Sequence, residues 1–234
     1  MNGLKFDLEK IGGKCRSVGA KFIVDGTQSV GIIPMDVKKF NIDAMVCASY
    51  KWLFGPYSVG LAYLGSSFNN GIPLEESWLN RTNAQDLNNL TEYNPNYKPN
   101  AGRYNVGETS NFILMPMLKQ SLIQVKNWLN SDIQSYSKEL IKPLQTYLKG
   151  LGIKFENTPY FSTHLFGLTL PQEIDIEQLK NNLIKNNVFL SVRGSSLRVS
   201  VHIFNTSQDI IKLLEVIEET RRIKHQNGVK LKGS

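Results

Sequence analysis

Two short apolar segments, each ending in a charged residue and a turn, place the strongest constraint on the fold. The first is Phe22–Asp25, and the second is Asp43–Ala48, which leads directly to Lys51. Apolar runs of this length, bounded by turn residues, predict buried β-strands. The neighbouring elements expected from the pattern are helices at residues 4–19 and 37–41 and a third strand at residues 60–65. This alternation of helix and strand predicts an α/β layer with parallel strands.

The charged residues at the two strand ends indicate a chemistry. A lysine can form a Schiff base with the aldehyde of pyridoxal phosphate, and an acid can pair with the protonated pyridine nitrogen. Lys51 and Asp25 stand at positions that suit these two roles. Gln28 follows Asp25 closely enough to donate to the ring hydroxyl, and Ser49 and Tyr50 offer hydroxyls to the phosphate. These five residues are the expected cofactor site.

Four sequence blocks in order resemble the class V aminotransferase family, which includes cysteine desulfurases, selenocysteine lyases, kynureninase and isopenicillin-epimerase-like enzymes. The blocks are Val24–Gly31, Ala48–Pro56, Arg103–Asn111 and Leu197–Thr206. Four blocks in the correct order are far more specific than any one of them. The resemblance extends from Gly3 to about Ile223.

The resemblance implies a pyridoxal-phosphate enzyme of fold type I that acts on an amino acid and forms a homodimer. It assigns Arg198 to the α-carboxylate of the substrate, since a planar guanidinium binds a carboxylate through two parallel hydrogen bonds. It assigns Thr109 to the phosphate of the partner subunit, although Glu108 is an insertion in that block. Tyr50 stands where many members have histidine, and the kynureninase-like branch has tyrosine there.

Each site residue also has a plainer interpretation. Lys51 taken alone reads as a surface lysine, and Asp25 as a turn residue, because Asp-Gly is a common turn. Tyr50 can be a half-buried aromatic residue. Arg198 can be a cation on a strand surface. The combination of the blocks favours the cofactor and substrate roles.

The rest of the chain suggests a second part. Residues 66–110 lack periodicity, and a loop of this length is functional or disordered in most proteins. We therefore expect residues 1–111 to form part of a large cofactor-binding domain, and residues 112–234 to form long helices and a small α+β C-terminal domain. The elements expected in that second part are helices at 112–130, 131–148, 176–186 and 206–223, and strands at 153–156, 161–170, 188–192 and 197–201.

The position of Lys51 adds an expectation about completeness. In the resembled family the equivalent lysine lies near the middle of a chain that is much longer. We therefore expect this chain to be the C-terminal part of a fold type I enzyme, with the N-terminal half of the large domain missing. That half supplies the glycine turn around the phosphate and the aromatic residue stacked on the ring.

Composition limits the partners. The net charge is +7 and the pI is about 9.3, but the lysines are scattered apart from the tail at residues 221–232, so no nucleic-acid partner is expected. Cys15 and Cys47 are the only cysteines and read as packed thiols, and no metal-ligand spacing occurs. Neither an 18-residue apolar run nor a signal-peptide core is present, so we expect no membrane contact and a cytoplasmic location.

The sequence therefore predicts a pyridoxal-phosphate enzyme of the aminotransferase or lyase type. A cysteine desulfurase is not expected, because the segment Arg193–Arg198 lacks the nucleophilic cysteine that such enzymes carry before the arginine block. The choice among transamination, β-elimination, racemisation and hydrolytic C–C cleavage stays open. Two alternatives also stay open, a non-catalytic fragment or pseudoenzyme of the same fold and a basic binding module.

Overall fold

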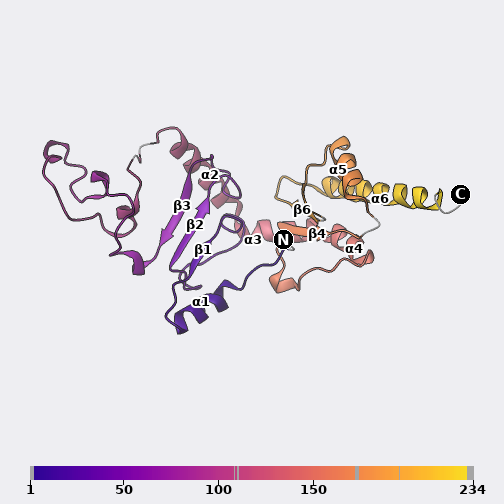
Figure 1. The fold of residues 1–234 in the computed structure, drawn as a ribbon, viewed down its shortest axis with the longest axis horizontal. Helices are drawn as coiled ribbons and strands as arrows, with labels where there is room; N and C mark the ends of the chain where they lie inside the picture. The colour runs from indigo at the N-terminus through magenta and orange to yellow at the C-terminus, as the bar shows by residue number, and fades with distance from the viewer. Residues whose placement is uncertain (1–2, 108, 110, 172–173, 195, 231–234) are drawn as a thin grey trace. The chain divides into compact units, whose positions relative to one another are not determined.

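The computed structural model describes residues 3–107, 109, 111–171, 174–194 and 196–230 (Figure 1). The chain divides into two compact units. Residues 7–130 form the N-terminal unit, and residues 131–234 with residues 1–6 form the C-terminal unit. The predicted domain boundary after residue 111 would place the helix Leu114–Trp128 in the second part, whereas its contacts place it in the N-terminal unit. The functional boundary at residue 111 stays a prediction.

The N-terminal unit is built on a three-stranded sheet in the order β1-β2-β3. Strand β1 (Ile23–Asp25) is parallel to β2 (Ala44–Ala48), as the strand pattern predicts. Strand β3 (Gly60–Leu64) is antiparallel to β2, and here the expectation of parallel strands was wrong. The connection between β2 and β3 is short, whereas a parallel crossover needs a dozen or more residues.

Two helices accompany this sheet. Helix α1 (Leu8–Ser17) begins at Asp7, whose Oδ1 accepts a hydrogen bond from the Lys10 amide at 3.1 Å. Helix α2 (Leu114–Trp128) contributes Val125 to a small apolar core with Cys47 and Leu53. Side chains alternate along a strand, so Cys47 and Met45 point to the same face of β2. Helix α2 packs on this face through the contact of Val125 with Cys47. Ile23 and Val46 are on the other face and are 61% and 49% exposed.

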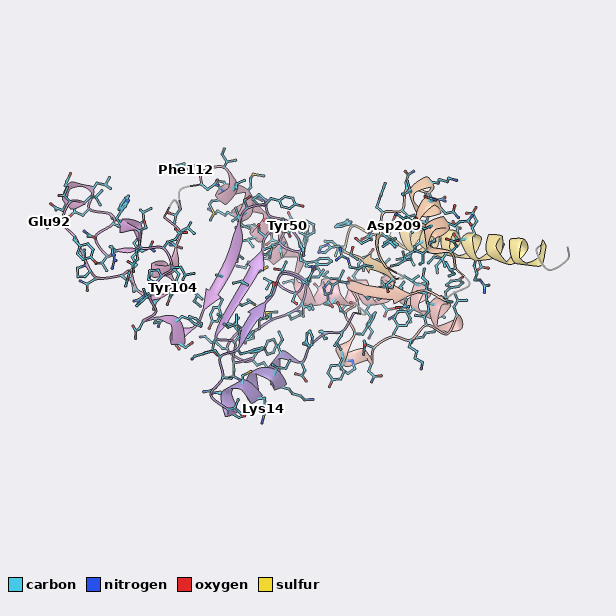
Figure 2. All side chains as sticks on the ribbon, viewed as in Figure 1. Lys14, Tyr50, Glu92, Tyr104, Phe112 and Asp209 are labelled. Atoms are coloured by element: carbon cyan, nitrogen blue, oxygen red, sulfur yellow. The ribbon has the colours of Figure 1, made fainter. Side chains whose placement is uncertain are left out.

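Residues 66–107 form an ordered polar segment, although they lack α-helices and β-strands. Arg81 organises it, with its guanidinium 4.1 Å from the ring centroid of Tyr97, an ion pair to Glu76 and a 2.8 Å hydrogen bond to the Pro95 carbonyl. Figure 2 labels Glu92 and Tyr104 in this part of the chain. Its short 3-10 turns are Ser66–Phe68, Trp78–Asn80, Leu87–Asn89 and Asn100–Tyr104.

The C-terminal unit contains an antiparallel sheet in the order β4-β6-β5, covered by helices. Its core includes Phe166, Leu179, Leu197 and Ile217, all fully buried. The elements are α3 (Asn130–Leu140), α4 (Lys142–Gly150), β4 (Leu165–Thr169), α5 (Ile176–Lys185), β5 (Ser191–Arg193), β6 (Ser196–Ser200) and α6 (Ser207–Lys230).

Several predicted elements of this unit differ from the structure, including the strand expected at 188–192, which is observed as β5 at residues 191–193. The helix expected at 131–148 is two helices, because Pro143 lies in the first turn of α4, where a missing N–H is tolerated. The strand expected at 153–156 is absent, and Ile153 and Phe155 pack on the core from irregular backbone. The strand expected at 161–170 is limited to β4. Across the described residues, no helix combines the length and the apolarity that a membrane span requires.

Candidate active site

Asp25 and Lys51 lie at the same edge of the first sheet. Asp25 is the last residue of β1 and is in register with Val46 of β2. Lys51 lies in the turn just after β2, and the arrowheads of both strands point to this edge (Figure 1). The two side chains interact electrostatically, since the charge of Lys51 helps to lower the pKa of Asp25. The acid and the lysine are therefore brought together as the strand pattern predicts.

Hydrogen bonds hold the Asp25 carboxylate in its charged form. Its Oδ1 accepts from the Thr27 amide at 2.9 Å. The bonds from the Thr27 hydroxyl and amide are the largest causes of the lowered pKa of Asp25, and the charge of Lys51 adds to them. The carboxylate is accordingly ionised at neutral pH, which is the state that keeps a neighbouring ring nitrogen protonated.

Thr27 is a further residue of the candidate site, to which the sequence assigned no role. Its hydroxyl bonds to Asp25 and also accepts a 3.1 Å hydrogen bond from the Ala48 amide, at the end of β2. One side chain thus ties the acid to the strand that leads to Lys51. The Asp-Gly-Thr turn was the available signal, because an aspartate commonly binds backbone two residues further along.

Gln28 is fixed by a neighbour of the lysine. Its Oε1 accepts a 3.0 Å hydrogen bond from Nε1 of Trp52. An indole N–H can only donate, so this bond determines which end of the Gln28 amide faces Trp52. The –NH₂ group is then the end directed elsewhere, which suits the predicted donation to a ring hydroxyl.

Ser49 has a structural use in this arrangement. Its side chain is fully buried, and its hydroxyl lies 2.7 Å from the carbonyl oxygens of Pro56 and Val59, to which it can donate. The Ser49 amide also donates to the Val59 carbonyl at 3.2 Å. Ser49 therefore closes the loop that carries Lys51, and its phosphate contact stays a prediction that competes with these bonds.

Tyr50 faces the lysine side chain. Its ring stacks on Tyr57 with the centroids 4.4 Å apart, and Nζ of Lys51 lies 5.7 Å from its centroid. Tyr50 is 41% exposed and is labelled in Figure 2, just past the end of β2. It is therefore a half-exposed aromatic residue that packs beside Lys51, and its phosphate contact also stays a prediction.

The third block is less well defined around Thr109. Thr109 is exposed, and its carbonyl accepts a 3.0 Å hydrogen bond from the Asn111 amide. Glu108, the insertion in this block, lies outside the described residues. Arg103 donates to the carbonyls of Lys98 and Gly71 at 3.2 and 3.1 Å, so it stabilises the polar segment.

Arg198 belongs to the C-terminal unit and lines a cavity of about 730 Å³. It lies on β6 directly opposite Ser191 of β5, and its Nη2 donates to the Ser191 hydroxyl at 3.3 Å. Within the described ranges, no carboxylate forms an ion pair with Arg198. An arginine at a cavity wall without an anionic partner suits a carboxylate ligand better than a purely surface role.

The remaining cysteine and histidine side chains are weak candidates for a nucleophile or a metal ligand. Cys47 is buried, and burial together with the nearby Asp25 charge raises the pKa of its thiol. His164 is buried beside Ser162 and Gln134, with ring-nitrogen distances of 3.1 and 3.2 Å to them. No group of three histidine, cysteine, aspartate or glutamate side chains suited to a metal occurs in the part of the chain that the structure describes.

Comparison with known families decides the relationship. The family model described as Aminotransferase class-V matches residues 1–213. The chain belongs to the class V aminotransferase family. The predicted family and the predicted fold class, an α/β fold that matches the C-terminal part of fold type I enzymes, are both confirmed.

Individual members of the class V aminotransferase family resemble the chain over most of its length. Kynureninase from Cryptococcus neoformans var. neoformans is 25% identical over 239 residues, which cover 93% of this chain and 51% of that enzyme. The cysteine desulfurase CsdA from Escherichia coli has a TM-score of 0.76 at 18% identity, with 93% and 55% of the two chains covered. Ureidoglycine-glyoxylate aminotransferase from Bacillus subtilis has a TM-score of 0.67 at 18% identity, with 95% and 58% covered.

These similar proteins are named for different enzyme activities, so the similarities support the shared fold and leave the substrate open. The chain spans about half the length of the curated relatives that it matches over most of its own length.

Proposed function

We propose that this chain carries the cofactor lysine and the substrate arginine of a pyridoxal-phosphate enzyme that acts on an amino acid. The observation that supports this most strongly is that an ionised Asp25 ends β1 while Lys51 follows the end of the adjacent parallel strand β2. Ligands commonly bind beyond the carboxyl ends of strands in α/β sheets. Membership of the class V aminotransferase family supports the same function.

The residues present fit this cofactor. Pyridoxal phosphate, when bound, withdraws electrons from the α-carbon of an amino acid. Asp25 supplies a carboxylate that the Thr27 hydroxyl and amide keep charged, and Lys51 supplies a primary amine beside it. Gln28 has an amide –NH₂ group directed away from Trp52. The donor set therefore matches a protonated pyridine nitrogen, an aldehyde and a ring hydroxyl.

Each residue then has one proposed role. Lys51 would hold the cofactor through Nζ, and its amine would move a proton to and from the substrate α-carbon. Asp25 would hold a proton on the ring nitrogen, and Gln28 would donate to the ring hydroxyl. Arg198 binds the α-carboxylate. The proposed phosphate contacts are Ser49, Tyr50 and, across the interface of a cytoplasmic homodimer, Thr109.

Persulfide chemistry is not part of the proposal. The segment Arg193–Arg198 contains no cysteine. Cys47 is buried and the pKa of its thiol is raised, which lowers the thiolate fraction that a nucleophile needs. Alkylation of the native chain should therefore leave any turnover unchanged. Sulfide release from cysteine that stops on alkylation would contradict this exclusion.

Substitution of Asp25 tests the proposal. Asp25→Asn keeps the side-chain shape and removes the charge, so the chain should retain part of its cofactor binding and lose amino-acid turnover. Asp86→Asn is the matched control, because Asp86 is exposed in the polar segment. Binding is followed by the visible absorbance of the cofactor, and turnover with a panel of amino acids.

The outcomes separate the alternatives. Loss of turnover in Asp25→Asn with an unchanged Asp86→Asn supports the proposal. Turnover that is equal in Asp25→Asn and in the unsubstituted chain would show that the acid has another role. A chain that binds no cofactor at any concentration would favour the non-catalytic alternative.

A further inference from the structure

The cavity beside Arg198 carries a single net positive charge among its described lining residues. Its ionisable members are Arg198, Lys180 and Glu177. Lys180 and Glu177 lie one turn apart on α5 with Nζ and Oε2 3.9 Å apart, so their charges offset each other. Arg198 has no such partner in the described ranges and donates to the Ser191 hydroxyl. The cavity therefore matches one carboxylate at Arg198, since its second cation, Lys180, is paired with Glu177.

The rest of the wall is mostly apolar. Leu183, Val188, Leu190 and Val192 line the cavity and belong to, or pack on, the core of the C-terminal unit. Side chains anchored in a core provide a fixed apolar surface, in contrast to loop residues that can turn away. A polar substrate side chain would lose its hydration against these four residues, and of the two hydroxyls in the described lining, that of Ser191 already accepts from Arg198.

One lining residue is unusually exposed for its type. Phe189 is 81% exposed although it borders the cavity. It lies just before β5, the strand whose Ser191 contacts Arg198. A large exposed aromatic side chain beside a cavity gains most from a ligand that covers it. The volume of about 730 Å³ leaves room for such a ligand, since pockets for drug-sized molecules range from about 300 to 1,000 Å³.

From these observations we infer that the substrate of the Arg198 site is an amino acid with a large apolar or aromatic side chain and only one carboxylate. Arg198 binds the carboxylate, Phe189 covers the side chain, and an acidic side chain is disfavoured by the apolar wall, because the remaining cation of the described lining, Lys180, is paired with Glu177. This inference rests on the proposed function, in which Arg198 holds the substrate carboxylate. It goes further by naming the substrate class and Phe189 as a specificity-determining residue.

The test uses two carboxylates that lack an amino group, so that binding is measured apart from cofactor chemistry. The probes are 3-phenylpropionate, which has one carboxylate and an aromatic ring, and glutarate, which has two carboxylates. Isothermal titration calorimetry on the full chain should show 3-phenylpropionate binding about tenfold or more tighter than glutarate. Arg198→Lys should weaken the binding of 3-phenylpropionate, because the two parallel hydrogen bonds are lost.

Phe189→Ser is the decisive variant. It should weaken the binding of 3-phenylpropionate by about tenfold and leave the binding of glutarate unchanged, because only the aromatic probe contacts that position. Phe112→Ser is the matched control, since Phe112 is 86% exposed in the other unit and should affect neither probe. The inference is overturned if glutarate binds more tightly than 3-phenylpropionate or if neither probe binds. It is also overturned if Phe189→Ser binds 3-phenylpropionate as tightly as the unsubstituted chain does.

Borohydride reduction with pyridoxal phosphate, carried out on the same preparations, separates this inference from the proposed function. A trapped adduct on Lys51 together with a preference for glutarate refutes the inference alone. Normal selection of 3-phenylpropionate without any adduct on Lys51 refutes the proposed cofactor role and supports the ligand class of the cavity.

Discussion

Thr27 connects the two charged residues of the candidate site. Its hydroxyl bonds to the Asp25 carboxylate and accepts from the Ala48 amide at 3.1 Å. The acid and the strand that leads to Lys51 thus share one hydrogen-bonding side chain. A displacement of the Thr27 side chain would therefore change both the pKa of Asp25 and the position of Asp25 relative to Lys51.

Thr27→Val should therefore raise the pKa of Asp25, because the largest cause of the lowered value is lost. An aspartate with a lowered pKa contributes stability above its ordinary pKa and loses it as the pH falls through the folded value, so this acid-side loss should begin at higher pH in the variant. Cofactor affinity should fall about tenfold, the effect of one lost hydrogen bond of about 1–1.5 kcal/mol.

NMR titration of the Asp25 carboxyl carbon in the Thr27→Val variant measures the change in the pKa of Asp25. Absorbance titration with pyridoxal phosphate measures the change in cofactor affinity. Thr27→Ser keeps the hydroxyl and is the matched control, with both quantities near those of the native chain. An unchanged Asp25 titration in Thr27→Val would contradict the assigned hydrogen bond.

Helix α1 depends on close contact at one of two adjacent glycines. A Cβ on Gly12 would lie 1.8 Å from the Phe40 carbonyl oxygen, whereas a Cβ on Gly13 would meet no atom within 4 Å. Gly12→Ala should therefore destabilise the N-terminal unit, by about 1–3 kcal/mol for overpacking. Gly13→Ala should stabilise it by up to about 1 kcal/mol, because alanine favours a helix over glycine.

Chemical denaturation of the two variants checks this pair. The two substitutions are identical in chemistry and adjacent in sequence. Opposite changes in the free energy of unfolding would therefore be due to the contact with Phe40. Equal effects from Gly12→Ala and Gly13→Ala would mean that α1 does not pack on this carbonyl.

Helices α4 and α6 are joined by a charged contact that should depend on pH. Hydrogen bonds from Tyr147 of α4 and from Arg221 and Arg222 of α6 lower the pKa of Glu218 to about 2. Because this pKa is lower when the chain is folded, the stability from Glu218 is present above the ordinary glutamate pKa. It is lost as the pH falls from there toward about 2.

Glu218→Gln should consequently lower the melting temperature at pH 6 and have much less effect at pH 2. The expected cost at pH 6 is about 1 kcal/mol, since the group is partly exposed. Glu219→Gln is the control, because Glu219 is exposed on the same helix. Equal losses at both pH values would show that the contact does not depend on the charge of Glu218.

The elements that could be predicted from the sequence are those determined by local pattern. The apolar runs before Asp25 and Lys51 are strands β1 and β2, and Asp175 caps α5 by accepting from the Gln178 amide at 3.0 Å. The direction of β3 was missed because its apolar pattern contains no information on its partner. Residues 153–156 were predicted as a strand, but Ile153 and Phe155 pack on the core from irregular backbone.

The residues of the candidate site likewise divide into those that could be predicted from the sequence and those that could not. The acid and the lysine could be placed because Asp25 ends one apolar run and Lys51 follows the other, and these runs are the adjacent strands β1 and β2. The bridging role of Thr27 and the buried hydrogen bonds of Ser49 could not be predicted, because they depend on backbone groups distant in sequence. The apolar cavity at Arg198 likewise forms only when α5, β5 and β6 pack together.

At the scale of the whole molecule, the same fold is found in a cysteine desulfurase and in an aminotransferase, and the chain spans about half the length of its curated relatives. The central claim therefore concerns a chemical property of this chain itself, the reactivity of Lys51 toward pyridoxal phosphate. The chain contains many other lysines on its surface, and these provide an internal comparison.

The most direct measurement is peptide mapping after borohydride reduction of the chain with pyridoxal phosphate at near-stoichiometric concentration. The account predicts that the reduced adduct is found on Lys51 in preference to all other lysines, and that Lys51→Ala loses it. An adduct spread evenly over the surface lysines, or one that is retained at the same level in Lys51→Ala, would contradict the account.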